Sequence, residues 1–159
     1  MRDARHYVRT LAMQALFSLD AGGNGELEGV FELTCSDAEP PPDADLAGRA
    51  AELAKAAWSR RPELDALIQS VSQHWDLPRM GGVDRAILRL AAHELLSEDR
   101  PGDAVIINEA IELAKTFGTS ESPSFVNGIL DAVRKRRDAP QPAAGNSGGR
   151  RLPSPAKDS

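Results

Sequence analysis

Apolar residues recur every three or four positions along most of the chain, which is the spacing of helices that bury one face. No stretch alternates strictly between apolar and polar residues, so no strand is predicted. The spacing predicts an all-α protein of about seven helices. We expect them at Arg5–Leu19, Glu26–Leu33, Ala44–Arg60, from Pro62 to about Trp75, at Val83–Ser97, and as two helices of a hairpin within Val105–Val133.

Glycine and proline mark the breaks between these helices. Gly22, Gly23 and Gly25 end the first helix, and three prolines make Ser36–Asp43 a linker within the domain. In the hairpin, Gly118 is expected in the left-handed conformation that closes a helix, and Ser122 before Pro123 is expected to cap the next one. The helix over Val83–Ser97 is apolar nearly all round, which is typical of a helix at the centre of a bundle.

Length and composition favour one helical domain with a short tail. A chain of 159 residues can bury a core without a metal or a disulfide, and its 4% aromatic content makes that core mostly Leu, Ile, Val and Ala. We expect the domain to cover residues 1–137. Residues 138–159 are mostly Pro, Gly, Ser and Ala, and this composition predicts disorder.

Several classes of chemistry lack a signature in the sequence. Cys35 is the only cysteine, so neither an internal disulfide nor a cysteine-based zinc site can form. His6, His74 and His93 have no ligand spacing, and no phosphate-binding loop or hydrolase elbow is present. We therefore expect no catalytic site, no metal and no cofactor. Without a signal peptide or a membrane-spanning stretch, the sequence indicates a cytoplasmic protein with no membrane partner.

The charge of the chain is segregated although its net value is −5. Residues 20–45 carry eight acids and no lysine or arginine, whereas arginines cluster near both ends of the domain. Arg2, Arg5, His6 and Arg9 share one side of the first helix if that helix extends back to Arg2, and Phe17 lies outside its apolar stripe. Arginine with an exposed ring is what single-stranded nucleic acid requires. Alternatively, the arginines only solvate a helix end and Phe17 packs on a neighbouring helix.

Three ordered segments resemble the NusB family of bacterial transcription antitermination factors. They are Arg9–Phe17 (RTLAMQALF), Val83–Leu96 (VDRAILRLAAHELL) and Val105–Leu130 (VIINEAIELAKTFGTSESPSFVNGIL), and the similarity runs from about Arg5 to Val133. The resemblance implies two three-helix bundles packed across each other. It also implies binding to the single-stranded boxA element of nascent ribosomal RNA, jointly with the small-subunit ribosomal protein NusE, within the RNA polymerase antitermination complex.

The resemblance assigns roles to particular residues. The RNA-binding positions that it implies, together with the basic side of the first helix, are Arg2, Arg5, His6, Arg9, Gln14, Phe17, Glu121 and Phe125. Phe17 stands where the family usually has tyrosine, which keeps the ring and loses the hydroxyl. Asp84 and Arg85, at the start of the central helix, are expected to bind NusE. Asn108, Asn127 and Gly128 are interpreted as structural: the two amides would bond backbone between the bundles, and the glycine would allow close helix contact.

Two other functions fit the same fold. NusB-like domains occur at the front of RNA cytosine methyltransferases, but such an enzyme needs a long cofactor-binding domain and this chain runs into its polar tail instead. The chain could also be a protein-docking module without RNA contact. The sequence does not fix the oligomeric state, and a homodimer is one assembly that it allows.

Overall fold

The structure is a computed structural model that describes residues 2–22 and 26–140. In these ranges the chain forms α1 (Arg2–Asp20), α2 (Leu27–Asp37), α3 (Ala44–Ser59), α4 (Arg61–Val71), the short 3-10 helix η1 (Leu77–Arg79), α5 (Gly82–Leu96), α6 (Asp103–Phe117) and α7 (Ser122–Asp138). No strand occurs in the described part. The all-α prediction is confirmed, with α2 reaching four residues further than expected.

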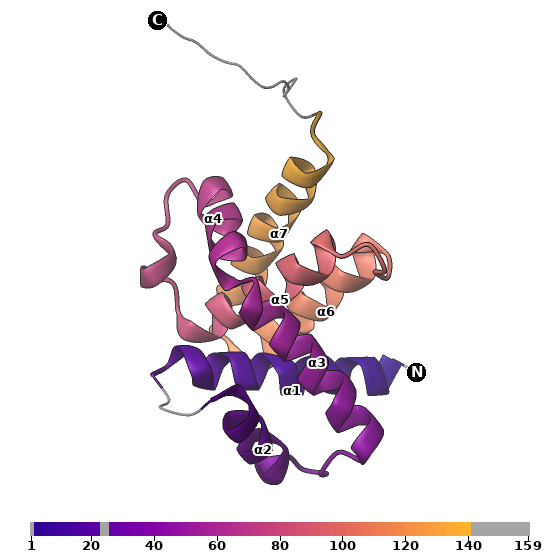
Figure 1. The fold of residues 1–159 in the computed structure, drawn as a ribbon. Helices are drawn as coiled ribbons and strands as arrows, with labels where there is room; N and C mark the ends of the chain where they lie inside the picture. The colour runs from indigo at the N-terminus through magenta and orange to yellow at the C-terminus, as the bar shows by residue number, and fades with distance from the viewer. Residues whose placement is uncertain (1, 23–25, 141–159) are drawn as a thin grey trace, which may run out of the picture.

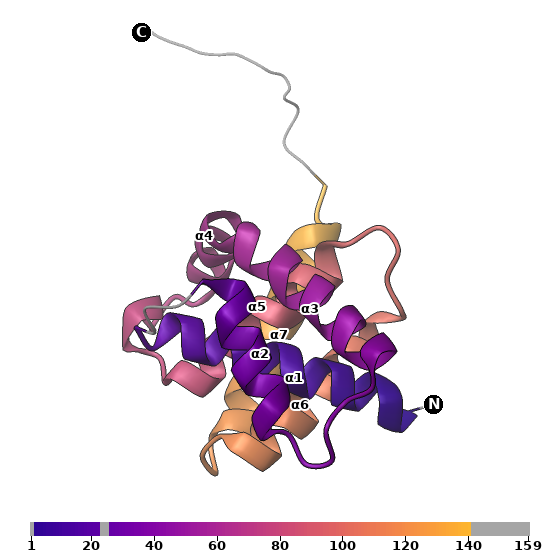
Figure 2. The ribbon, with the colours of Figure 1, turned by 60° about the horizontal axis from the view of Figure 1, so that its bottom comes forward.

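The helices form two groups that meet at α5 (Figure 1). In the first group α1, α2 and α3 pack on one another. In the second, α5, α6 and α7 form a three-helix bundle, and α4 packs against α5 and α7. Because α1 and α3 also pack on α5, that helix is shared by both groups, and a second view shows the other helices surrounding it (Figure 2). The expected pair of crossed bundles is confirmed.

The central position of α5 follows from its sequence. Most of its residues are buried, among them Ile87, Leu88, Leu90 and Leu95. Each buried side chain of this size contributes about 1.5–3 kcal/mol relative to an exposed one. A helix that is apolar on every side can reach this burial only between two layers, and the two groups supply them.

A charged network fixes the end of α1 on the central helix. The carboxylate of Asp20 pairs with Arg85 at 2.7 Å and with Arg89 at 3.0 Å, and Arg89 also pairs with Asp65 of α4 at 2.8 Å. Burial alone would raise the pKa of Asp20, but the hydrogen bonds from the two arginines outweigh it and lower that pKa. The network therefore joins α1, α4 and α5.

The turn between α6 and α7 differs in detail from its prediction. Gly118 has φ −95° and ψ −162°, so its backbone is extended and not left-handed. A side chain there would lie 2.4 Å from the Ser122 hydroxyl and 2.9 Å from the Ala114 carbonyl oxygen, so close approach is the reason for glycine. Ser122 is the first residue of α7 and does not cap it. Its buried hydroxyl instead accepts a hydrogen bond from the Thr119 amide at 3.0 Å.

Three residues interpreted as structural are exposed. Asn108 on α6 and Asn127 on α7 both face solvent, so neither amide is buried between the bundles. Gly128 is exposed as well, and nothing lies within 4 Å of the position a side chain would take. The structural interpretation of these three residues is therefore wrong.

The predicted tail lies almost wholly outside the described residues. The helical domain was expected to end at residue 137, and α7 ends at Asp138. In the part of the chain that the structure describes, no helix combines the length and the apolar character needed to cross a membrane.

Candidate nucleic-acid interface

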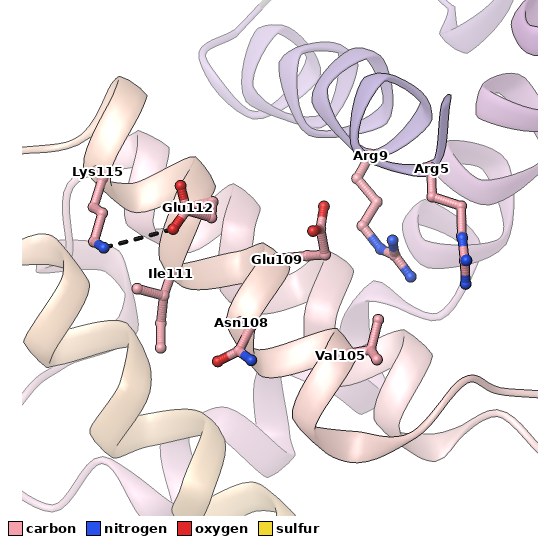
Figure 3. Close-up of a pocket in the computed structure, with 8 residues that line it drawn as sticks. All are labelled: Arg5, Arg9, Val105, Asn108, Glu109, Ile111, Glu112 and Lys115. Carbon is pink, nitrogen blue, oxygen red and sulfur yellow. Dashed lines mark ion pairs between the residues drawn. The ribbon is translucent and has the colours of Figure 1, made fainter. Parts of the chain in front are cut away.

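A groove of about 490 Å³ lies between the first half of α1 and the outer side of α6 (Figure 3). We call it the arginine groove, and it is lined by Arg5, Arg9, Val105, Asn108, Glu109, Ile111, Glu112 and Lys115. The side chains of Arg5 and Arg9 extend from α1 toward α6 in the close-up. Arg5 is exposed and makes no ion pair with any described residue, so its guanidinium is available to an anion.

Arg9 occupies this groove differently from the expectation. Its relative exposure is only 6%, and its Nε and Nη2 donate to the two oxygens of Glu94 on α5 at 2.8 and 2.7 Å. Burial by itself would lower the pKa of Arg9, but the hydrogen bond to Glu94 outweighs it and raises that pKa. This guanidinium therefore holds α1 onto α5, a role that the sequence did not predict, and whether Arg9 also contacts RNA stays a prediction. Only its Nη1 has no hydrogen-bond partner among the described residues.

The basic stripe predicted on α1 consists of Arg2, Arg5, His6 and Arg9, and its members differ in whether they are bonded internally. His6 lies 2.8 Å from Glu109 through its Nδ1, so it joins α1 to α6. The Arg2 side chain lies outside the described part of the structure. Arg5 is therefore the one member of the stripe whose charge is shown to be free among the side chains described.

Gln14 lines a separate groove. Gln14 lies nine positions after Arg5, and this offset puts the two side chains about half a turn apart around the helix. Its neighbours in that groove come from α1, α2 and the end of α6, and they include Tyr7, Thr34 and Phe117. The structure thus does not bring Gln14 together with Arg5.

Phe17 combines the two alternatives that the sequence left open. Its relative exposure is 38%, so much of the ring is open to solvent. The other side of the ring packs on Gly82, where a β-carbon would lie 2.9 Å from the ring atom Cε1. The ring is thus both anchored on the start of α5 and accessible.

A second groove, which we call the aromatic groove, lies at the start of α5 and at the α6–α7 turn. Its lining residues are Trp75, Arg79, Met80, Gly81, Asp84, Thr119, Ser120, Glu121, Ser122, Ser124 and Phe125. Three of the predicted site residues, Asp84, Glu121 and Phe125, come together here. Gly81 directly precedes Gly82, on which the Phe17 ring packs, so that ring lies near one end of this groove without lining it.

Sequence reasoning missed Trp75 and Arg79. Trp75 fits the apolar spacing of the fourth helix and was assigned to its buried face, but α4 ends at Val71 and the indole is 55% exposed. Its ring meets that of Phe125 at a centroid distance of 5.5 Å and an angle of 75°. Pro78 disfavours helical backbone at Leu77 and so signals the end of a helix in this region, but no comparable signal marks the actual end at Val71.

Arg85 is engaged in internal hydrogen bonds at the start of α5. Its Nε donates to Asp20 at 2.7 Å, and its Nη1 donates to the Met80 carbonyl at 2.7 Å and to the Leu77 carbonyl at 3.2 Å. These bonds use the guanidinium to fix the chain that leads into α5. This internal role was not predicted from the sequence, and the expected contact between Arg85 and a partner protein stays a prediction.

The geometry of the two grooves suits the binding of a ligand more than catalysis. Within the described ranges, no group of three or more His, Cys, Asp or Glu side chains is placed to hold a metal ion. What the surface does offer is a free guanidinium at one end of α1, and at the other end an accessible ring beside an aromatic groove. The described part of the chain is thus an all-helical protein of two packed groups, with one groove between them and a second groove within the group of α5, α6 and α7.

Comparison with known proteins identifies the family. The NusB family matches residues 6–135. The transcription antitermination protein NusB of Symbiobacterium thermophilum is 44% identical over 136 residues, which cover 82% of this chain and 88% of that protein. The chain belongs to the NusB family. The name of this relative describes a transcription antitermination protein.

Solved structures show the same fold. NusB of T. maritima superposes with a TM-score of 0.74 at 35% identity, covering 82% of this chain and 90% of that one. A structure of the antitermination factors NusB and NusE in complex with double-stranded RNA contains a chain that superposes with a TM-score of 0.73 at 25% identity, covering 86% and 99% of the two chains.

Proposed function

We propose that this protein is a transcription antitermination factor that binds the boxA element of nascent ribosomal RNA transcripts together with NusE. As part of the RNA polymerase antitermination complex, it would help the polymerase to read through terminators. Membership of the NusB family supports this proposal, as does the relative whose chain is bound to NusE and RNA. The function places the protein in the cytoplasm, where such transcripts are made.

One observation carries the RNA-binding part of the proposal. Helix α1 bears the free guanidinium of Arg5 near its start and the accessible ring of Phe17 near its end. Twelve residues separate the two, which is about 18 Å along a helix. A single strand can follow such a surface, because arginine holds its phosphates and the ring stacks on an unpaired base. On this view, residues 1–137 form the RNA-binding unit.

NusE is proposed to bind the second bundle near Asp84, where the resemblance puts it. Arg85 is proposed to support this contact by fixing the chain that leads into α5, because its guanidinium bonds to Asp20 and to the Met80 carbonyl. The exposed polar residues of α6 and α7, including Asn108 and Asn127, offer further hydrogen-bonding groups on the same bundle.

Fluorescence polarisation with labelled boxA RNA tests the proposal, using a scrambled RNA of the same composition as reference. We expect preference for boxA, tighter binding when NusE is added, and weaker binding by Arg5→Ala. Arg136→Ala is the matched control, because Arg136 is exposed near the far end of α7 and makes no ion pair with a described residue. Binding of NusE without any affinity for RNA would instead support the protein-docking alternative. Light scattering on the same samples determines whether a homodimer is the species that binds.

A further inference from the structure

We infer that Trp75, with Phe125 and Arg79, forms a stacking site for an unpaired nucleobase of the bound RNA. The inference rests on the proposed RNA-binding function and extends it to a tryptophan and an arginine to which no role has been assigned. It makes the aromatic groove a base-binding subsite beside the Phe17 ring.

Hydrogen bonds to the backbone around Trp75 hold this residue in its exposed position. The side chain of Gln69 donates to the Trp75 carbonyl at 2.9 Å and accepts from the Leu77 amide at 2.8 Å. The Trp75 amide donates to the Ser72 carbonyl at 3.1 Å. These three bonds fix the chain on both sides of the indole. A large ring that is fixed and still 55% exposed is preorganised for a ligand.

The geometry of the ring pair leaves the Trp75 ring accessible. Trp75 and Phe125 meet edge to face, with an angle of 75° between their planes, so the two rings are not stacked on each other. Phe125 is half-buried against the core, whereas the Trp75 side chain is 55% exposed. A nucleobase stacks on a free aromatic face, and each such contact is a main source of affinity for single strands.

The charges of the groove match a nucleotide. Arg79 is exposed, makes no ion pair with a described residue, and is the one cation among the described lining residues, so it can hold a phosphate. Asp84 and Glu121 supply carboxylate oxygens in the same groove. Asp84 Oδ1 is buried, so the carboxylate of the exposed Glu121 is the one that a ligand in this groove can reach.

Carboxylates at a stacking site also predict which bases fit. Aspartate and glutamate accept hydrogen bonds from the exocyclic amino groups of bases, as in contacts to cytosine N4. Uracil has no amino group, so the subsite should favour adenine, cytosine or guanine over uracil. A peptide segment would use the apolar rings but would not need an arginine beside two carboxylates. The position beside Phe17, at the start of α5, also favours RNA as the occupant, because both rings then contact one strand.

The two tryptophans of the chain allow a direct test. In a Trp58→Phe variant, Trp75 is the sole tryptophan, and its fluorescence should be quenched as single-stranded boxA RNA is added. In the matched Trp75→Phe variant the remaining tryptophan is Trp58, which stacks on Arg61 at 3.8 Å from its ring centroid. That variant should show no comparable quenching.

Affinity measurements then test the energetic role. Trp75→Ala should weaken RNA binding by about 5- to 150-fold, and Trp75→Phe by much less, because stacking depends on the ring. A set of boxA RNAs, each with one base removed, identifies the base that stacks on Trp75. Removal of that base should weaken binding to the wild type, but should hardly weaken binding to Trp75→Ala further. Replacing that base by uracil should weaken binding in the wild type, and Glu121→Gln should reduce this discrimination. Circular dichroism verifies that the variants remain folded, as expected for an exposed side chain.

The outcomes separate this inference from the proposed function. If the wild type binds boxA RNA and Arg5→Ala weakens binding, but Trp75→Ala does not and Trp75 is not quenched, the subsite is refuted and the function stands. If Trp75→Ala weakens only NusE binding, the groove is a protein-docking site and the inference is wrong. If the wild type binds no RNA with or without NusE, both proposals fail together.

Discussion

Arg9 of α1 and Glu94 of α5 form a buried ion pair with two hydrogen bonds, at 2.8 and 2.7 Å. This pair joins the first helical group to the central helix of the second. Breaking a buried pair by removing one partner leaves an uncompensated charge, which costs about 3–5 kcal/mol. The arginine nearest the centre of the predicted RNA surface is thus first of all a structural residue.

We predict that Arg9→Ala lowers the free energy of unfolding by about 3–5 kcal/mol, measured by urea denaturation. Arg5→Ala should change it by less than about 0.5 kcal/mol, because Arg5 is exposed and unpaired among the described residues. The double variant Arg9→Met/Glu94→Leu should recover most of the loss, since it leaves no buried charge. Equal stability of the two single arginine variants would show that the Arg9–Glu94 pair does not hold the bundles together.

The large distance along the sequence between Arg9 and Glu94 explains why the sequence did not reveal their ion pair. Arg9 and Glu94 are 85 positions apart, and helical spacing within α1 shows only that Arg9 lies beside the apolar stripe. Whether a charge at that border faces solvent or a partner depends on which helix packs there, and that is a tertiary property. The position of α5 could be predicted, because a helix that is apolar on all sides has to be surrounded.

Other parts of the site were missed for local reasons. Trp75 continues the 3.6-residue spacing beyond the true end of α4, so periodicity assigned it to the core. Gly118 was correctly placed after a helix, but it is needed for its lack of a side chain beside Ser122 and not for a left-handed backbone. Asp84, Glu121 and Phe125 were predicted from the family resemblance alone, and whether they contact RNA or NusE stays a prediction.

Gly118 and Gly128 should respond in opposite ways to alanine. Gly118→Ala places a methyl group against the Ser122 side chain and the Ala114 carbonyl, so we expect a loss of about 1–3 kcal/mol in the free energy of unfolding. Gly128→Ala, in an exposed helical position with open space around it, should gain about 0.4–1 kcal/mol. Thermal denaturation of both variants measures this difference. Similar melting temperatures for the two would contradict the close contact at Gly118.

Asp20 should make the stability of the protein depend on pH. Its folded-state pKa lies below its ordinary value of 3.8, so its stabilising effect is complete above that value and is lost as the pH falls through the folded pKa. We predict that Asp20→Asn costs about 1.5–3 kcal/mol at pH 7, and that the difference from wild type narrows below about pH 4. Urea unfolding at several pH values measures it. Asp45→Asn serves as control, because Asp45 is exposed and its nearest ion pair is 3.9 Å long. A constant difference at all pH values would contradict the assignment.

Gly82 should affect RNA binding through the ring of Phe17. In Gly82→Ala the new methyl group would lie 2.9 Å from the Phe17 ring, which therefore has to move. We expect weaker boxA binding by Gly82→Ala, and no further weakening when Gly82→Ala is added to Phe17→Ala. Gly48→Ala is the matched control, because Gly48 is exposed on α3, lines neither groove and has nothing within 4 Å of its added carbon. Polarisation titrations of the wild type, Gly82→Ala, Phe17→Ala and the double variant form a double-mutant cycle. Strict additivity of the two changes in binding free energy would show that Gly82 does not act through Phe17.

The dependence of RNA affinity on salt should separate charge from stacking. Each neutralised phosphate adds about 0.7 to the slope of log affinity against log salt for a single strand. Arg5→Ala should therefore flatten the slope by about 0.7, because its guanidinium is free. Phe17→Ala should lower affinity by about 1–3 kcal/mol at every salt concentration and leave the slope unchanged, because stacking involves no counterion release. Arg9→Met with Glu94→Leu should also leave the slope nearly unchanged, since the Arg9 charge is already neutralised by Glu94. If this double change flattened the slope as much as Arg5→Ala does, Arg9 would have to leave Glu94 when RNA binds. If Phe17→Ala lowered the melting temperature without affecting RNA binding, its ring would be a packing residue only.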